Sequence, residues 1–461
     1  MQRLIAIIWL TWKAAFRFRL FLVVAVLLLA SVVGLPLLIK DDGTARGFTQ
    51  ILLTYTLSAI TALLGLSTLW LACGTLARDI EECQMQVVAV KPIARWQIWL
   101  GKWLGIMLLN AALLALSGAS VYGLLLWRAH RLPEDQRQIL RDEVLVARAG
   151  AKEPSILAKI ERDADQVLRE RLAKNPVARV DLPQVRKQIL EQIKAEYQIV
   201  MPGYVREWRI DLGPAAAAHR DQPLFLRIKF NAGDNSWSGN FVGLWQIGAG
   251  RPGQPAVRLE PMHLAPDTFH EFQIPNMIDD KGVLTVTFVN PNSTSLLFPL
   301  DEGMEVLYRE GGFLLNYARG LGIIFCWMAV LAALGLAAAS FLSFPVAAFL
   351  SLGVLTLVFS TGTLATAVSA GSILGSNSET GEIGHSIVDG AVIPVFRLTL
   401  KVISFAKDFS PVDSLSTGRS ITWSQLGLAF IQIVVLLGGI LGCIGIFAFS
   451  RRELATAQGN Q

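Results

Sequence analysis

Charged side chains are concentrated in one stretch between two long apolar runs, "LARDIEECQMQVVAVKPIARWQIWLGKWLG", residues 76–105. A compact acidic turn is followed by an apolar strip at 87–90 and then by a basic turn. Such an order gives a partner protein a surface to bury and charges that fix its register. The alternative is a polar loop that only joins two helices, which needs neither this length nor this order. The residues that we predict to dock a partner are Arg78, Asp79, Glu81, Glu82, Lys91 and Arg95.

Residues that could support catalysis or metal binding do not form a recognisable set. The five histidines lack the spacing of metal ligands. His263, His270 and Glu271 could meet, but solvated or core roles are the favoured interpretation. The sequence contains neither a GxxxxGK[ST] phosphate loop nor a GxSxG nucleophile motif. We therefore expect no enzyme activity, no metal and no cofactor in this chain.

The composition predicts a membrane protein with a soluble part. Hydrophobic residues make up 53% and charged residues 17% of the 461 residues, whereas soluble proteins carry about 25% charged residues. The net charge of +5 is modest, and no basic stripe argues for a nucleic-acid partner. A crossing helix needs about 20 apolar residues. Six runs qualify, at about 20–38, 51–73, 98–126, 313–339, 344–370 and 426–449, so we expect a polytopic α-helical protein with six transmembrane helices.

A further helix is expected before the first run. Leu4, Ile7, Ile8, Thr11 and Ala15 share one face at helical spacing, and the basic residues of this segment lie elsewhere. This pattern is typical of a helix in the membrane interface. The alternative is that the first crossing simply starts early.

The distribution of lysine and arginine predicts the orientation. The basic residues before the first run, in the charged stretch and at 451–452 would all lie in the cytoplasm, together with both termini. Residues 128–310 would then be extracytoplasmic, and residues of about 371–424 would form an outer interfacial segment.

The large insert is expected to be an α+β domain. Residues 128–203 have helical periodicity, for example Ile189, Ile193 and Tyr197. Residues 204–310 alternate apolar and polar side chains between turn-rich segments, which predicts a β-sandwich. Trp237, Phe241 and Trp245 could form a stacking platform, but core packing is favoured.

Polar residues within the crossings could line a substrate path. The candidates are Thr54, Ser58, Thr61, Asn110, Thr363 and Thr366. Ordinary helix packing is favoured for the hydroxyls, while Asn110 is as well explained by an interhelical hydrogen bond as by a path.

The charged stretch also carries a family resemblance. Its "RDIEEC…KPIARWQIWLGKWLG" resembles the pattern "RDxEEGT…PxSRWxxLLGKxLG" of permease subunits of type-2 ATP-binding-cassette (ABC) exporters, with Cys83 in place of a glycine. The resemblance covers the six crossings and their flanks but not the insert. It is loosely nearest to permeases grouped with copper-enzyme maturation systems.

The resemblance implies a multi-pass protein of the bacterial cytoplasmic (inner) membrane, with a coupling helix at about 76–95. This helix would dock on a separate cytoplasmic ABC ATPase, present in two copies, which would bind ATP and Mg. A second permease copy, or a related permease, would complete the transporter, and an extracytoplasmic accessory protein is a further candidate partner. Residues 1–127 and 311–461 would form the membrane part. The alternative function is a mechanotransmitting or sensing protein, whose outer domain is coupled to an ATPase without moving substrate.

Overall fold

The computed structural model describes residues 2–17, 20–38, 44–82, 84–85, 93–174, 182–213, 222–233, 239–248, 256–373, 386, 388–407 and 409–452. The chain divides into two compact units. The helical unit comprises Met1–Val146 and Gly312–Gln461, and the β unit comprises Ala147–Gly311.

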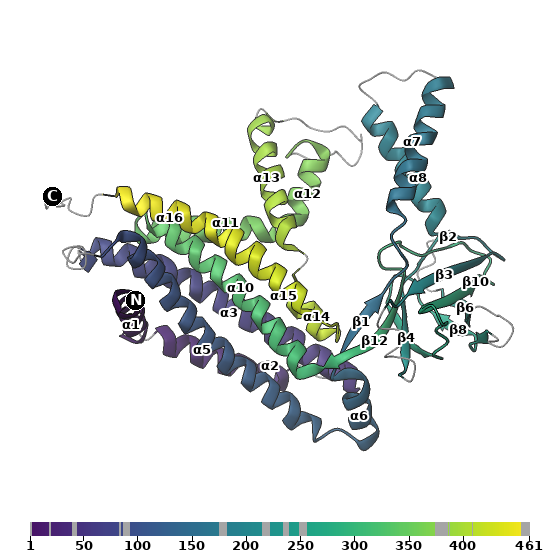
Figure 1. Ribbon diagram of the computed structural model, residues 1–461, viewed down its shortest axis with the longest axis horizontal. Coiled ribbons are helices and arrows are strands. Elements are labelled where there is room, and N and C mark those ends of the chain that lie inside the picture. The colour runs from purple at the N-terminus through teal and green to yellow at the C-terminus, as the bar shows by residue number, and fades with distance from the viewer. Residues whose placement is uncertain are drawn as a thin grey trace. The chain divides into compact units, whose positions relative to one another are not determined.

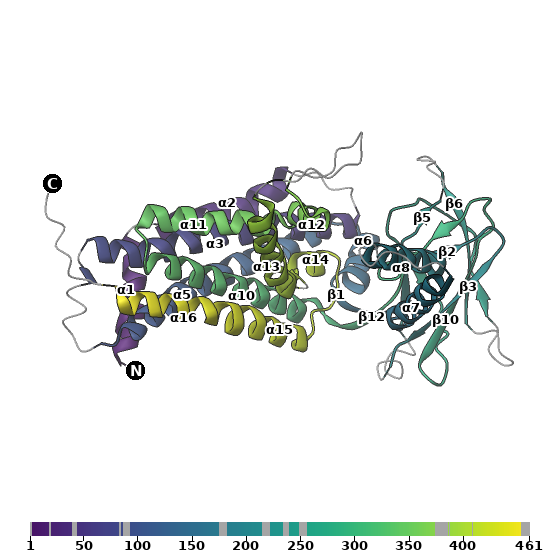
Figure 2. The same ribbon diagram turned by 90° about the horizontal axis from the view of Figure 1, so that it is seen from above.

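The helical unit is a bundle in which α3, α5, α10 and α16 run side by side (Figures 1 and 2). Its elements are α1 (Gln2–Arg17), α2 (Leu20–Leu38), α3 (Ala45–Glu81), α5 (Arg95–Ala129), α6 (Glu134–Ile139), the π-helix η1 (Leu140–Val144), α10 (Phe313–Ala339), α11 (Phe344–Phe359), α12 (Thr361–Ala370), α13 (Asp389–Lys407), α14 (Pro411–Ser416), α15 (Trp423–Ala429), the π-helix η2 (Phe430–Gly438) and α16 (Gly439–Arg451).

Among the described residues, four helices are long and apolar enough to cross a membrane: α3, α5, α10 and the continuous helix of α15, η2 and α16. A fifth crossing results if α11 and α12 are counted together, although this pair is bent by 67°. In α2, the described apolar stretch Val23–Leu35 is shorter than a full crossing. By length and composition the described residues thus support four or five crossings, and the sixth stays a prediction.

The predicted fifth crossing is broken at Ser360. The hydroxyl of Ser360 donates to the carbonyl of Thr356 at 2.9 Å, and that of Thr361 donates to the carbonyl of Val358 at 2.5 Å. Hydroxyls that bond to their own helix backbone compete with regular helical hydrogen bonds and favour bends. Sequence hydropathy does not detect such a break, because the side chains on either side remain apolar.

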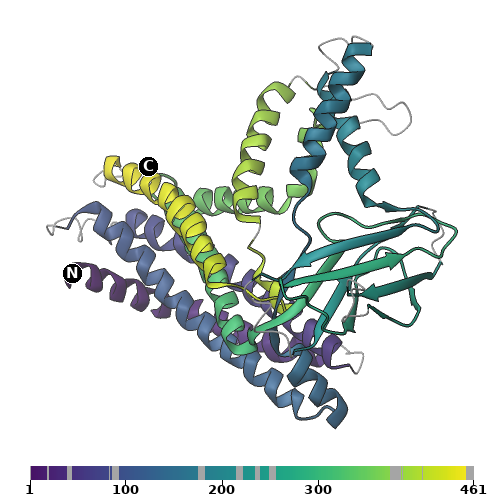
Figure 3. The ribbon, with the colours of Figure 1, turned by 45° about the vertical axis from the view of Figure 1, so that its right-hand side comes forward.

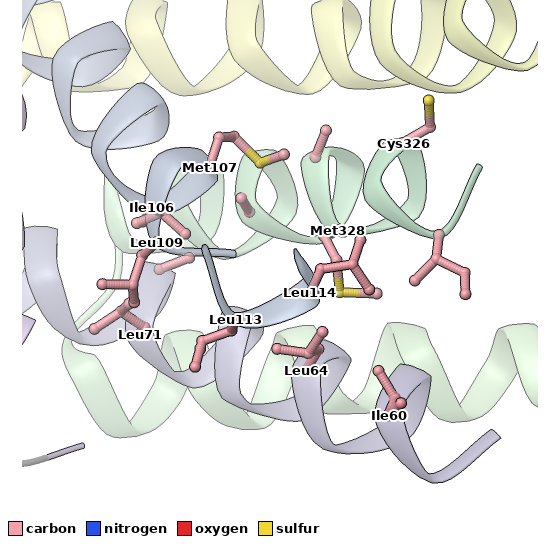
Figure 4. Packing of buried hydrophobic residues seen from close by; sticks show 14 of the residues in the cluster. Ile60, Leu64, Leu71, Ile106, Met107, Leu109, Leu113, Leu114, Cys326 and Met328 are labelled. Carbon is pink, nitrogen blue, oxygen red and sulfur yellow. The ribbon is translucent and has the colours of Figure 1, made fainter. Parts of the chain in front are cut away.

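The core of the bundle lies where α3, α5 and α10 meet. Leu64 of α3, Leu114 of α5 and Met328 of α10 are buried and lie close together (Figure 4). Small residues allow the helices to approach closely. A Cβ atom on Gly335 of α10 would lie 2.7 Å from the Cβ of Ala72 on α3, so only glycine fits this contact.

In the part of the β unit that the structure describes, three sheets accompany a helical hairpin. Its strands are β1 (Val146–Ala151), β2 (Ile199–Val200), β3 (Val205–Asp211), β4 (Leu224–Ile228), β5 (Asn231–Ala232), β6 (Phe241–Ile247), β7 (Val257–Arg258), β8 (Met262–Leu264), β9 (His270–Ile274), β10 (Val283–Val289), β11 (Leu296–Leu297) and β12 (Met304–Gly312). The sheet orders are β1-β12-β4-β9, β3-β10-β6-β7 with β8 on β6, and β2-β11-β5.

The two larger sheets share one core. In β10 the alternate residues Leu284, Val286 and Phe288 are buried, and β6 alternates in the same way. Antiparallel register places Val286 opposite both Trp208 of β3 and Ile247 of β6. The alternation in the sequence therefore correctly located these strands, since the inward-facing side chains are apolar.

The helical section of the β unit is a hairpin of α7 (Leu157–Lys174) and α8 (Leu182–Gln198), seen in Figure 3. Ile160, Ala164, Ile189 and Ile193 form its buried core. The prediction that 128–203 is helical throughout was wrong for Val146–Ala151, which forms β1 and pairs with β12. Its partner lies about 160 residues further along the chain, which is why local periodicity missed it.

Candidate functional site: the charged end of α3

The acidic turn is the end of a long helix and not a separate short helix. Arg78, Asp79 and Glu81 belong to the last turn of α3, and Glu82 follows as its C-cap residue. The preceding Leu76 and Ala77 are fully buried, so bundle packing extends α3 beyond the predicted crossing. Of the expected segment 76–95, Lys91 and the apolar strip at 87–90 lie outside the described residues.

Asp79 joins α3 to α5. Its carboxylate accepts from Lys102 Nζ at 2.5 Å, and the same ammonium donates to the carbonyl of Thr75 at 2.8 Å. Only 6% of Lys102 is exposed. A buried ammonium is stable only with such partners. Our predicted set omitted Lys102, although a lysine inside an apolar run is itself a signal, because it requires a nearby carboxylate.

Glu81 joins α3 to α11. Its carboxylate accepts from the backbone N–H of Phe344, the first residue of α11, at 2.9 Å. A carboxylate is unfavourable at the C-terminus of its own helix but favourable at the N-terminus of another. The guanidinium of Arg78 lies 4.5 Å from the centre of the Phe344 ring, and Trp70 contacts this ring edge-on.

Arg95 holds the end of α16. Its Nη1 donates to the carbonyls of Phe449, Ser450 and Arg452 at 2.8, 2.8 and 2.7 Å. These belong to the last, unpaired carbonyls of the helix, where a cation is favourable. Arg452 in turn donates to the carbonyls of Ala339 and Ser340 at the end of α10, at 3.3 Å each. This second contact was not predicted from the sequence.

Glu82 and Gln84 form the outward part of the turn. Both are exposed, and the Gln84 amide donates to the Glu82 carboxylate at 2.6 Å. The predicted docking residues therefore divide into two groups. Asp79, Glu81 and Arg95 make contacts between helices of the chain itself, whereas Glu82 is left at the surface.

The predicted path residues lie on three helices, α3, α5 and α12. Thr61 and Thr366 donate to the carbonyls of Leu57 and Gly362 in their own helices, at 2.7 and 2.8 Å. Ser58 and Thr363 are exposed, and Thr54 is partly buried. Hydroxyls satisfied by their own helix need no polar path to explain them.

Asn110 lies deep in the bundle, with 1% exposed. Its Oδ1 accepts from Thr68 on α3 at 3.0 Å, and its Nδ2 has no hydrogen-bond partner among the described residues. A cavity of about 10 Å³ adjoins it, which is room for roughly one water molecule. The contact with Thr68 is the interhelical hydrogen bond that one of the two interpretations predicted.

The remaining sequence candidates lie in the β unit. Glu271 is paired with Arg148, and His270 Nε2 lies 2.7 Å from the carbonyl of Ala265. Among the described residues no three His, Cys, Asp or Glu side chains are placed to hold a metal ion. Phe241 and Trp245 are buried in the core of the sheets, whereas Trp237 lies outside the described residues.

Comparison of this chain with protein-family models, with curated proteins and with solved structures gives no match. The resemblance of the charged stretch to ABC exporter permeases therefore rests on the residues quoted above.

Proposed function

We propose that this chain is the membrane permease subunit of an ABC transporter, driven by a separate cytoplasmic ATPase and working as an exporter. In this proposal six segments cross the bacterial cytoplasmic membrane, with α2 as the first and the bent pair of α11 and α12 as the fifth. Both termini face the cytoplasm, and residues 128–310 lie outside. Two ATPase copies and a second permease copy complete the assembly.

The observation that supports the proposal is the connection of one charged turn to several helices. Asp79 bonds to α5 through Lys102, and Glu81 bonds to the N-terminus of α11. Arg95, at the start of α5, bonds to the end of α16. A partner that moved this turn would therefore act on α5 and α11 together with α3. Glu82 and Gln84 offer the exposed polar contact that a partner needs.

The proposal is tested by reversing charge at the exposed Glu82 alone. Glu82→Lys leaves the contacts of Asp79 and Glu81 intact. We expect it to weaken co-purification with the co-expressed ATPase and to reduce ATPase stimulation by about tenfold, since a repulsive contact in a docking surface costs on the order of 1–2 kcal/mol. The matched control is Glu134→Lys, at an exposed residue of α6 on the proposed outer side. Unchanged binding and stimulation with Glu82→Lys would remove this turn from the docking role.

The orientation is tested separately. In a cysteine-free background, Gln84→Cys should resist a membrane-impermeant maleimide in intact cells, whereas Glu134→Cys should react. The opposite pattern would invert the orientation and exclude the proposed ATPase contact.

A mechanotransmitting protein is the second candidate, and close packing around Asn110 favours it. The polar pair of Thr68 and Asn110 adjoins only about 10 Å³ of free space. Such a protein would stimulate the ATPase and transmit changes to its outer domain, but vesicles that contain it would accumulate no substrate. Vesicles that contain an exporter would accumulate substrate.

A further inference from the structure

Strand β3 forms one edge of the sheet β3-β10-β6-β7 in the β unit (Figure 1). Among the described residues, β10 is the only strand that pairs with it. An edge strand carries a row of backbone N–H and C=O groups that can pair with another strand. With seven residues, Val205–Asp211, β3 has the length of an ordinary strand in a sheet and can accept a neighbour along its whole length.

The hydrogen bonds to β10 establish which residues of β3 face away from it. The backbone N–H of Leu212 donates to the carbonyl of Gly282 at 3.0 Å, and that of Asn290 donates to the carbonyl of Tyr204 at 3.1 Å. In an antiparallel pair, residues that bond to the partner strand alternate with residues whose backbone groups point away from it. The even-numbered residues of β3 therefore bond to β10. The odd-numbered residues, from 205 to 211, direct their N–H and C=O groups to the opposite edge.

The side chains of these odd-numbered residues are accessible as well. All four are exposed, whereas Trp208 and Ile210 between them are buried. Glu207 and Arg209 form an ion pair at 2.7 Å, and their side chains are 45% and 76% exposed. An exposed pair of this kind contributes little to stability, so its two charges can exchange partners at low cost. The charges on this edge are therefore available to an approaching strand.

The order of the charges makes this edge complementary to itself. If a second β3 paired with it antiparallel, about a two-fold axis at Trp208, Glu207 of each copy would lie opposite Arg209 of the other. Both residues direct their backbone groups outward, so each such pair would also exchange N–H···O=C hydrogen bonds. Opposite charges in facing positions stabilise a sheet, and like charges destabilise it. Moving the axis by one residue would place Glu207 opposite Glu207, or Arg209 opposite Arg209, so the charges select a single register.

We infer that β3 is a contact between two copies of this chain, whose sheets join edge to edge about Trp208 into one continuous sheet. Such a two-fold contact is isologous, because each copy supplies the same surface. It also places Val205, which is 59% exposed, diagonally opposite the aliphatic stem of Arg209 in the second copy. A different extended chain would need matching charges of its own, which a second copy already carries. The inference goes beyond the proposed function, because it requires neither transport nor an ATPase.

The test is disulfide cross-linking of the full chain in membranes isolated from cells without the ATPase. Two differently tagged chains are co-expressed in a cysteine-free background, one with Glu207→Cys and the other with Arg209→Cys. In the proposed register these positions face each other with Cα atoms about 5.5 Å apart, which a disulfide can span. Two Glu207→Cys chains instead place their cysteines diagonally, beyond this reach. We expect mild oxidation to cross-link the mixed pair about tenfold more than chains that all carry Glu207→Cys.

An exchange of charges tests the recognition itself. The reporter is Val205→Cys on one chain with Asp211→Cys on the other, since these positions also face each other in this register. When both chains carry Glu207→Arg, or both carry Arg209→Glu, like charges meet and reporter cross-linking should fall by about tenfold. When one chain carries Glu207→Arg and the other carries Arg209→Glu, opposite charges meet again and cross-linking should recover. Misfolding of either variant would not give this recovery.

The matched control is Arg186→Glu, which breaks another exposed ion pair of the β unit, that of Arg186 with Asp165. It should leave reporter cross-linking unchanged. Equal cross-linking of the mixed pair and of chains that all carry Glu207→Cys would exclude the register. The absence of cross-linking in both would refute the contact between copies, and cross-linking to a different protein would assign the edge to that protein instead. No ATPase is present, so these results do not depend on whether the proposed transport function holds.

Discussion

The two units bury apolar side chains in opposite patterns. In the helical unit, large apolar residues also face outward: Phe349 and Phe359 of the α11 segment are 80% and 81% exposed. In an 18-residue apolar window of the helix Trp423–Arg451, only 17% of residues are buried. The β unit instead has an aromatic core, with Trp245, Phe288 and Phe298 each at most 1% exposed. The difference indicates that the two units fold in different solvents, one apolar and one aqueous.

The units also differ in how their cores are filled. Helices α3 and α10 approach through small residues, so that Gly335 contacts Ala72 directly. The β unit fills the space between its sheets with rings, for example Trp245 at 4.6 Å from Phe288. Substitutions that remove side-chain volume should therefore destabilise the β unit more than the helical unit. Substitutions that add side-chain volume should destabilise the helical unit more.

The largest effect is expected from Trp245→Ala in the β unit. The ring packs against Phe288, Phe298 and Trp208, and removing it leaves a cavity that costs about 3–5 kcal/mol. Thermal unfolding of the purified chain, monitored by proteolysis within 147–311, measures the loss of stability. Phe269→Ala is the control, because Phe269 is 46% exposed and should cost far less. Equal losses would contradict the aromatic core.

A smaller effect is expected from Asp79→Ala in the bundle. It leaves the ammonium of Lys102 buried without its carboxylate, which costs about 2–3 kcal/mol. Lys102→Met should cost less, because the side chain of Asp79 is 28% exposed and can reach water. The double variant Asp79→Ala with Lys102→Met should recover part of the stability lost in Asp79→Ala. Melting curves of the detergent-solubilised variants measure these losses. If the loss in the double variant equalled the sum of the two single losses, the buried pair would be refuted.

Gly335→Leu should destabilise the bundle by about 1–3 kcal/mol through overpacking. Even its Cβ would lie 3.0 Å from the carbonyl of Leu69 and 3.2 Å from the backbone nitrogen of Cys73. Gly353→Leu in α11 is the matched control, since nothing lies within 4 Å of a Cβ there. The melting temperatures of the two variants should differ clearly, and a tolerated Gly335→Leu would contradict the close contact of α3 and α10.

The smallest effects concern two carboxylates of the β unit with opposite pH dependence. A hydrogen bond from Lys229, together with its charge, lowers the pKa of Glu302. Burial raises the pKa of Glu153, although the charge of Arg206 opposes this shift. Glu302 therefore stabilises the fold above its unfolded pKa, and this contribution is lost as the pH falls through its folded pKa. The contribution of Glu153 is present at low pH and is lost as the pH rises through its raised pKa.

Single substitutions separate these two contributions. At neutral pH, Glu302→Gln should lower the stability by well under 1 kcal/mol, because this pair is largely exposed. Glu153→Gln should raise it slightly. Both differences should diminish as the pH falls below the lowered pKa of Glu302, because both carboxyl groups are then protonated in the folded and unfolded states. Melting curves at several pH values check the signs, and a change of the same sign in both variants would contradict the assignment.

Much of the fold could be predicted from local pattern. The apolar runs located α3, α5, α10 and the last long helix, because a segment that lies in an apolar solvent must itself be apolar along its length. The alternation of "VLTVTFV" located β10, because one face of a half-buried strand must be apolar. The unusual density of charge at 78–102 marked the place where several helices are joined.

Apart from β1, the sequence by itself thus determined most of the helices and strands and which solvent each unit suits, because these follow from composition and period. Only the tertiary structure decided that Asp79 pairs with Lys102, that Glu81 caps α11 and that Arg95 closes α16. It alone also paired β1 with β12 and left Glu82 at the surface. The physical reason is that a charge or an edge strand can be satisfied by many partners, and the packing of distant segments selects one of them.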